Sequence, residues 1–409
     1  GAPALVFSNP VTIEMGGVAV PGSTATSAYL PLGMLLDLDQ PTEGVQVGFP
    51  DVNRYKAIGD FRVDGTFPEN KRLGLLLNLD AVKDLSFLTE LPEDRIELLG
   101  LPFNDAHTAL ENSALSLITG LKGLKSLYLD YFSVPKESLP LLKNLPVLET
   151  LAIHPEPLDA DAAALIAQLP TLKRLRIEYT DKEISSYVLL QLAKCTTLEE
   201  LWIGGRALET SGLEALAKLP ALRLLRIGPC EFDAQGLQHL AAFPVLRRLE
   251  FYDLSDEGMK HLPSIPSLKE LDIQGKHDGF SPEAFAAVAR MPGVESLAIT
   301  GRHSDDCIAQ LKPMTTLKSL GLHSLFQDEA KITDAVLAHL GSIPSLESLD
   351  IYTGNFTDAG WAALTSLPNL KHLYIPNAEI TDAALIHIGK ITNLEDLRIR
   401  ASDITDEGL

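Results

Sequence analysis

The sequence FTDAGWAALTSLPNLKHLYI, from Phe356 to Ile375, is the unit from which most of this chain is built. It begins with an apolar residue, a Thr and an Asp, runs through an apolar-periodic segment to a Leu-Pro pair, and ends in Leu-x-x-Leu-x-Ile. Thr caps a helix start by accepting a backbone N–H, and an acid beside it complements the helix dipole. Proline prevents the helix from continuing. The unit therefore predicts a short helix followed by a β-strand.

The Leu-x-x-Leu-x-Leu part of this unit recurs along the chain at spacings of 22 to 29 residues. Two degenerate copies, at Leu77-x-Leu79 and from Ile96 to Leu101, precede the clear ones. The 12 clear copies start at Leu124, Leu148, Leu172, Leu198, Leu222, Leu246, Leu268, Val294, Leu317, Leu346, Leu370 and Leu394. A repeat of this length is typical of a solenoid, in which each repeat buries the apolar face of its neighbours.

Each repeat predicts one core face and one open face. In a strand, side chains alternate, so Leu373 and Ile375 face the core while His372 and Tyr374 face the other side. A helix between successive strands makes the strands parallel. Parallel strands lie about 4.8 Å apart and packed helices about 8 to 10 Å apart, so the stack must bend with the strands inside. The predicted fold is an α/β solenoid, a curved horseshoe with parallel strands inside and helices outside.

The pattern from about residue 75 to 409 resembles that of leucine-rich-repeat proteins. It is nearest to the ribonuclease-inhibitor-like or cysteine-containing classes, and to bacterial repeats of the form T-D-x-G-L-x-x-L-x-x-L-x-x-L-x-x-L-x-I. The resemblance implies the horseshoe fold and a scaffold that binds partners, although repeats of this kind serve unrelated partners. The slot after the strand holds no regular Asn, so the loops are expected to depend on helix caps rather than on an Asn ladder.

Residues 1–72 do not carry the repeat, which is assigned to residues 73–409. Short strands are expected at Val11–Met15, Val45–Val47 and Phe61–Val63, separated by glycines and prolines. Because a solenoid exposes an apolar end unless something covers it, this β-rich or irregular segment is expected to be a cap. The alternative is a separate binding or enzymatic domain, or part of one. The chain stops at Leu409 in the first turn of a repeat helix, which leaves room for further sequence.

The charge of the chain limits its partners. With 34 Lys and Arg against 55 Asp and Glu, the net charge is −21, which argues against general binding to nucleic acid or to anionic membranes. No apolar run is long enough to insert into a membrane. The compartment stays open between the cytoplasm and export after removal of a leader, and so does the oligomeric state. Three dispersed cysteines, Cys195, Cys230 and Cys307, are expected to be buried free thiols.

No catalytic, cofactor-binding or metal-binding residues are predicted, because the chain has no phosphate-binding, dinucleotide, zinc-protease, hydrolase or EF-hand motif. Asp37-Leu38-Asp39 has only the start of a calcium-loop spacing and is expected to form a turn. Four histidines occupy the same slot before a strand signature and are expected to lie at helix ends, where a cation complements the dipole. They are His239, His261, His339 and His387.

The open strand positions predict where a partner binds. A first patch of arginines and aromatic residues, the residue types that dominate protein interfaces, falls on adjacent strands. Its members are Arg174, Arg176, Trp202, Leu224, Arg226, Arg248 and Tyr252. A smaller second patch consists of Tyr352, His372, Tyr374, Arg398 and Arg400.

Two readings of the first patch remain open. In one it binds an unknown protein partner on the concave face of a non-catalytic scaffold. Arg226→Glu and Trp202→Ala would then weaken binding and leave the melting temperature nearly unchanged. In the other, these residues form cross-strand pairs such as Arg174 with Glu200, or Arg248 with Glu270. At the level of the whole chain, the alternative function is a ligand-binding or regulatory accessory region of a larger enzyme or receptor.

Overall fold

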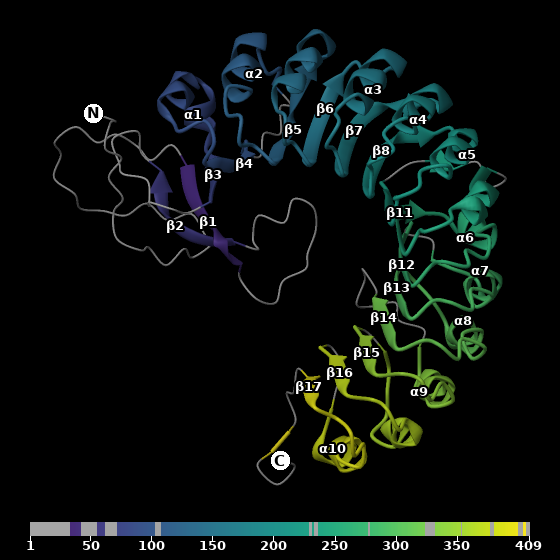
Figure 1. Cartoon of the computed structure of the whole chain (residues 1–409). Coiled ribbons are helices and arrows are strands. Elements are labelled where there is room, and N and C mark those ends of the chain that lie inside the picture. Colours follow the sequence, from purple (N-terminus) through teal and green to yellow (C-terminus); the bar gives the residue numbers. More distant parts are fainter. Residues whose placement is uncertain are drawn as a thin grey trace. The chain divides into compact units, whose positions relative to one another are not determined.

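The structure is a computed structural model that describes residues 33–41, 55–61, 72–102, 108–228, 231–232, 236–276, 279–323, 332–352, 354–376, 380–399 and 404–405. The chain forms two compact units, Gly1–Glu178 and Tyr179–Leu409. Each unit has its parallel strands on one side and its short helices on the other (Figure 1).

The first unit begins with an antiparallel piece. Strand β1 (Gly33–Pro41) pairs antiparallel with both β2 (Tyr55–Phe61) and β3 (Leu73–Leu77). The predicted turn at Asp37–Asp39 is therefore wrong, because these residues lie within β1. Pairing with β3 places β1 on the outer edge of the first repeat strand. The strands predicted at Val11–Met15 and Val45–Val47 lie outside the described residues.

Parallel strands follow in chain order from β3. They are β4 (Ile96–Gly100), β5 (Ser126–Pro135), β6 (Thr150–Glu156) and β7 (Arg174–Ile184), which runs across the boundary between the units. The helical segments of this unit are α1 (Leu79–Val82), η2 (Ser86–Glu90), α2 (Asn112–Ile118), η3 (Lys136–Asn144) and α3 (Ala160–Ala167).

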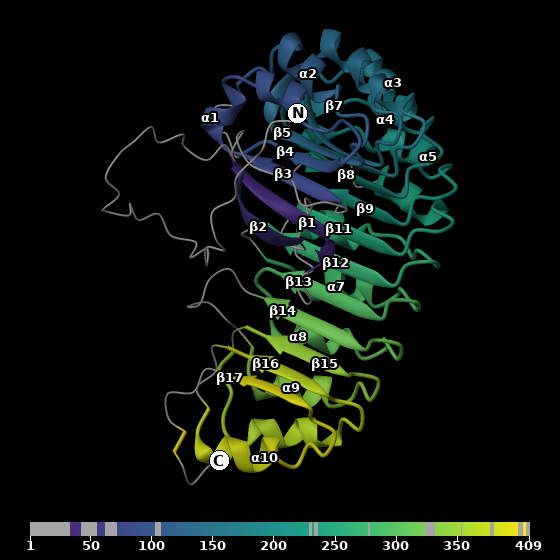
Figure 2. The ribbon, with the colours of Figure 1, turned by 60° about the vertical axis from the view of Figure 1, so that its left-hand side comes forward.

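The second unit continues the same alternation with its strands parallel and in sequence order (Figure 2). Its strands are β8 (Glu200–Leu208), β9 (Leu224–Ile227), β11 (Arg248–Leu254), β12 (Glu270–Gly275), β13 (Ser296–Thr300), β14 (Ser319–His323), β15 (Ser348–Ile351), β16 (His372–Ile375) and β17 (Asp396–Ile399). The short strand β10 (Glu231–Phe232) pairs with the end of β8.

Helical segments cover the outer side of this sheet and leave its inner side open (Figure 1). They are α4 (Ser186–Leu192), η4 (Thr210–Gly212), α5 (Leu213–Leu216), η5 (Gly236–Ala242), α6 (Asp256–Lys260), α7 (Pro282–Val288), α8 (Asp305–Ala309), α9 (Asp334–Leu340), η7 (Gly360–Ser366) and α10 (Asp382–Ile388).

The signature leucines line the space between sheet and helices. Leu370, Leu373 and Ile375 are each at most 1% exposed, and the repeats from Leu124 to Leu346 bury the same positions. Those of the last repeat, Leu394, Leu397 and Ile399, are only partly buried. The residues between the signature leucines, such as His372 and Tyr374, lie on the other face, as the alternation predicts. The fold is thus the predicted leucine-rich-repeat solenoid with a small β-rich segment at its N-terminal end.

Several helix starts are built as predicted, but that of the Phe356–Ile375 unit is not, because η7 begins only at Gly360 and Thr357 does not cap it. The Thr381 hydroxyl accepts a hydrogen bond from the backbone N–H of Ala383 at 3.1 Å, and the preceding Ile380 is buried. Ser255, Ser281 and Thr333 cap their helices in the same way. Each cap satisfies one of the backbone donors that a helix start leaves unpaired.

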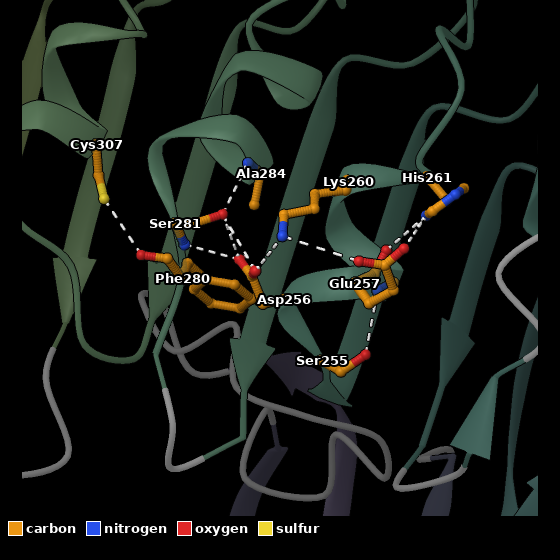
Figure 3. A network of polar contacts seen from close by, with 10 residues as sticks. Ser255, Asp256, Glu257, Lys260, His261, Phe280, Ser281, Ala284 and Cys307 are labelled. Atoms are coloured by element: carbon orange, nitrogen blue, oxygen red, sulfur yellow. Dashed lines mark hydrogen bonds and ion pairs between the residues drawn. The ribbon is translucent and has the colours of Figure 1, made fainter.

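The acid after each cap has a second role that joins neighbouring repeats. Asp256 accepts hydrogen bonds from the backbone N–H of Ser281, at 2.7 Å, and from its hydroxyl, at 2.8 Å (Figure 3). The same pair of bonds links Asp305 to Thr333, Asp334 to Thr357 and Asp382 to Thr405. This chain of carboxylates and caps is called the Asp–cap ladder below. It ties these four pairs of neighbouring repeats together on the helix side of the sheet.

Cysteine and histidine also lie largely where the sequence predicts. Cys195 and Cys307 are buried free thiols, whereas Cys230 lies outside the described residues. His239, His339 and His387 lie in the last turns of η5, α9 and α10, and His261 directly follows α6.

Candidate functional site

The structure divides the first predicted patch between the two units. Arg174 and Arg176 lie in the first unit, where the Arg174 guanidinium donates to the Thr150 hydroxyl at 2.9 Å and Arg176 is only 5% exposed. Trp202, Leu224, Arg226, Arg248 and Tyr252 lie in the second unit, on β8, β9 and β11. The part of the patch with aromatic residues is therefore a feature of the second unit.

In the second unit an arginine lies against two aromatic rings. The Trp202 and Tyr252 rings are nearly parallel, with an interplanar angle of 8° and centroids 6.2 Å apart. The Arg226 guanidinium carbon lies 4.1 Å from the Trp202 centroid and 5.8 Å from that of Tyr252. A guanidinium at this distance is attracted to the face of the ring. We name Trp202, Arg226, Glu250 and Tyr252 the aromatic–arginine cluster.

Glu250 holds this cluster in place. Sheet register sets Trp202 opposite Arg226 and Arg226 opposite Glu250. The Glu250 carboxylate, 2% exposed, pairs with Arg226 and with Arg248, whose Nε lies 2.5 Å from Glu250 Oε1. Arg248 also reaches Glu270 at 3.1 Å, which is the cross-strand pair that the second reading of the patch predicts. One of the two pairs named for the second reading, Arg248 with Glu270, is therefore present, and partner binding stays a prediction.

Burial changes what a substitution at Arg226 would do. Arg226 is 8% exposed and paired, so the expectation that Arg226→Glu leaves the melting temperature nearly unchanged is wrong. The variant would bring a second carboxylate beside the buried Glu250 and leave Arg248 as the cation that both acids share, which is strongly destabilising. Trp202 is only partly buried and remains suitable for a binding test.

The next strand adds a second acid beside the cluster. Asp272 lies opposite Glu250 in the register of β11 and β12. Burial, and after it the charge of Glu250, raises the pKa of Asp272 above its ordinary value of 3.8, although the positive charge of Arg248 opposes the shift.

The second predicted patch is brought together only in part. The Tyr352 and Tyr374 rings meet edge to face, with centroids 5.5 Å apart. Arg398 pairs with Asp396 at 3.0 Å on its own strand, and His372 lies opposite Asp396 in the sheet register. Arg400 lies outside the described residues.

Sequence reasoning missed two members of this second neighbourhood, His323 and Asp350. The His323 ring lies 4.5 Å from that of Tyr352, and its Nε2 is 3.4 Å from Asp350 Oδ2. Both residues occupy open strand positions, and the signal that would have found them is the same alternation that placed Tyr352 and Tyr374.

A column of charged residues was also missed. The residue directly before most strands is charged, and the backbones of successive members are hydrogen-bonded. In the first unit Lys125 pairs with Glu97, and Lys173 with Glu149, each at 2.9 Å. In the second unit the column consists of Glu199, Arg223, Arg247, Lys269, Glu295, Lys318, Glu347, Lys371 and Glu395. We name it the charge column. Reading the position after the first signature Leu from repeat to repeat would have revealed it.

Within the described part of the chain, no group of three or more His, Cys, Asp and Glu residues is placed to hold a metal ion. None of the described helices has the length and apolar character needed to cross a membrane.

Comparisons with known proteins yield structural similarity only. No protein-family model matches the chain, and no curated protein matches it. Among solved structures, the chain is similar to an internalin from Listeria monocytogenes, with 18% identity, a TM-score of 0.49, and coverage of 81% of this chain and 87% of that one. It is also similar to a leucine-rich-repeat protein from Leptospira interrogans, with 15% identity, a TM-score of 0.38, and coverage of 80% and 88%. The spacing of its own repeats and the register of its own parallel strands make this chain a leucine-rich-repeat solenoid.

Proposed function

We propose that the chain is a non-catalytic scaffold that binds a protein partner on the inner face of its second unit, at the aromatic–arginine cluster. The observation that carries this proposal is the arginine that a buried glutamate holds against two nearly parallel aromatic rings. Trp, Tyr and Arg contribute most of the binding energy in protein interfaces, and side chains already fixed in one geometry lose little entropy on binding.

We also propose that the repeats are of the ribonuclease-inhibitor-like or cysteine-containing type. Helices of seven or eight residues in α3, α7, α9 and α10, which alternate with parallel strands, support this assignment.

The test is affinity capture from the native host with the parent chain and with Trp202→Ala and Tyr252→Ala. Each substitution removes one ring from the cluster and is expected to reduce capture of the parent's partners by roughly tenfold or more, in line with the loss of an interface hot spot. Tyr187→Ala is the matched control, because Tyr187 is a 69% exposed aromatic residue on α4, on the helix side. Equal capture by all four proteins would contradict the proposal.

A further inference from the structure

Within the second unit the charge column alternates in sign with one exception. From Lys269 to Glu395 the sequence of charges is strictly positive, negative, positive. Glu295 shows what alternation provides, because its carboxylate accepts from Lys269 at 2.7 Å and from Lys318 at 2.8 Å. These two hydrogen bonds, first Lys269 and then Lys318, lower the pKa of Glu295 to about 2. A glutamate between two cations is thus the regular arrangement of this edge.

The exception is the run Arg223, Arg247 and Lys269, three cations on consecutive strands. Their backbones are joined directly, since Arg247 N–H donates to the Arg223 carbonyl and Lys269 N–H to that of Arg247, both at 2.8 Å. Arg223 is paired with Glu199, and Lys269 with Glu295. Arg247 is exposed, and no described residue places a carboxylate within ion-pair distance of it. Like charges on adjacent strands repel, so this run lowers stability.

The run lies on the strands that carry the aromatic–arginine cluster. Arg223 directly precedes β9, which holds Arg226, and Arg247 directly precedes β11, which holds Glu250 and Tyr252. On a chain with a net charge of −21, three adjacent cations form a local exception to the overall sign. Functional sites are expected at residues that depart from a regular pattern, here the alternation of charge, and thereby lower the stability of the fold.

We propose that Arg223, Arg247 and Lys269 receive an acidic segment of the protein partner, whose Asp or Glu side chains supply the negative charge missing from this edge. This inference rests on the proposed function and names the chemistry of the partner. Carboxylates are the fitting group because a carboxylate already bridges two cations at Glu295, one strand further along. Guanidinium groups bind carboxylates through paired, charge-assisted hydrogen bonds.

The test uses fluorescein-labelled octaglutamate and the full chain, with binding followed by fluorescence anisotropy at low and at high ionic strength. The parent is expected to bind the probe and to lose it at high salt, because exposed charge pairs are screened. Arg247→Gln and Arg247→Glu are expected to weaken binding by roughly tenfold or more.

Although Arg247→Glu is expected to weaken probe binding, it is expected to stabilise the fold. It would restore alternation and place a carboxylate between Arg223 and Lys269, which raises the melting temperature by about 1 to 4 °C. Lys371→Glu is the matched control. It breaks alternation beside Glu347, so it should lower the melting temperature and leave probe binding unchanged.

Three results would overturn the inference. They are absence of octaglutamate binding by the parent, equal binding by Arg247→Glu, and Arg247-dependent binding of tripolyphosphate without binding of octaglutamate. Trp202→Ala separates this inference from the proposed function, because it removes a ring and no cation. It should retain the probe even as it loses the partner, so failure of one proposal can be told from failure of the other.

Discussion

Glu250 is the residue on which the geometry of the aromatic–arginine cluster depends. A carboxylate that is 2% exposed is costly to desolvate, and two arginines offset that cost. The outcome is a guanidinium fixed against Trp202 instead of a flexible cation in water. Burial also raises the pKa of Asp272, the acid opposite Glu250 on the next strand.

Asp272 yields a prediction about pH. A carboxyl group whose folded-state pKa is raised binds more protons in the folded chain than in the unfolded chain. Its stabilising contribution is therefore complete below the ordinary value of 3.8 and is lost as pH rises through the raised pKa. Asp272→Asn removes the ionised form, so it should raise the melting temperature at neutral pH. The advantage should vanish below pH 3.8. A variant that is less stable than the parent at neutral pH would contradict this account.

At the scale of single residues, the sequence predicted on which face of the sheet a side chain lies, but not which other side chains it contacts. Alternation along the strand correctly placed Trp202, Arg226 and Tyr252 on the open face, because it depends only on backbone geometry. It could not show that Arg226 pairs with Glu250 rather than facing solvent. That outcome depends on side-chain conformation and burial across three strands, which no single repeat specifies.

At the scale of the helix and its cap, Thr-Asp performs two tasks in two repeats. Thr333 caps its own helix, and Asp334 accepts two hydrogen bonds from Thr357 in the next repeat. At this contact a glycine makes room for the acid, because a methyl group at Gly360 would overlap the carboxylate of Asp334. Gly360 thus admits the acid of the preceding repeat.

A double-mutant cycle tests this arrangement. Asp334→Ala removes two hydrogen bonds to Thr357, at 2.8 and 2.6 Å, and should lower the free energy of unfolding by about 1–2 kcal/mol. Gly360→Ala should destabilise the parent through the overlap. In the Asp334→Ala background the overlap is absent and alanine is the better helix former, so Gly360→Ala should stabilise by up to about 1 kcal/mol. Urea denaturation measures all four proteins, and an equal effect of Gly360→Ala in both backgrounds would refute the proposed role of this glycine.

The sequence predicted the caps and not the ladder for a physical reason. A cap bonds within two or three residues, so local spacing is enough to identify it. Asp256 and Ser281 belong to different repeats and are joined only because their two helices stack. The interaction of the acid with the helix dipole already explained why an acid follows the cap, so nothing in the sequence indicated this second bond.

At the scale of the whole molecule, repeat spacing predicted the parallel sheet because every strand has the same neighbours. It did not predict the division between Glu178 and Tyr179, since Leu172 and Leu198 are 26 residues apart, within the range found elsewhere. Nor did it predict β1 and β2, which lie outside the repeat and have no periodic signal.

Removal of residues 1–72 tests whether these residues are a cap. The deletion removes β1, which pairs with β3 from Gly33–Leu77 to Asp37–Leu73. Because each repeat contacts only its neighbours, hydrogen exchange should accelerate in β3 and β4 and stay unchanged in β14 to β16. Undisturbed exchange in β3 would indicate an independent domain instead.

The charge column also bears on how the chain reaches its native arrangement. In an array of similar turns, the easiest error is to omit one turn and stack the next in its place. Alternating signs penalise that error, because omission of a single turn sets lysine beside lysine or glutamate beside glutamate. Omission of any one of the three turns that start with Arg223, Arg247 or Lys269 escapes the penalty, since it creates no like-charge pair beyond those that the native order already contains. Misassembly should therefore concentrate at these three turns, the ones whose charges are proposed to serve a partner.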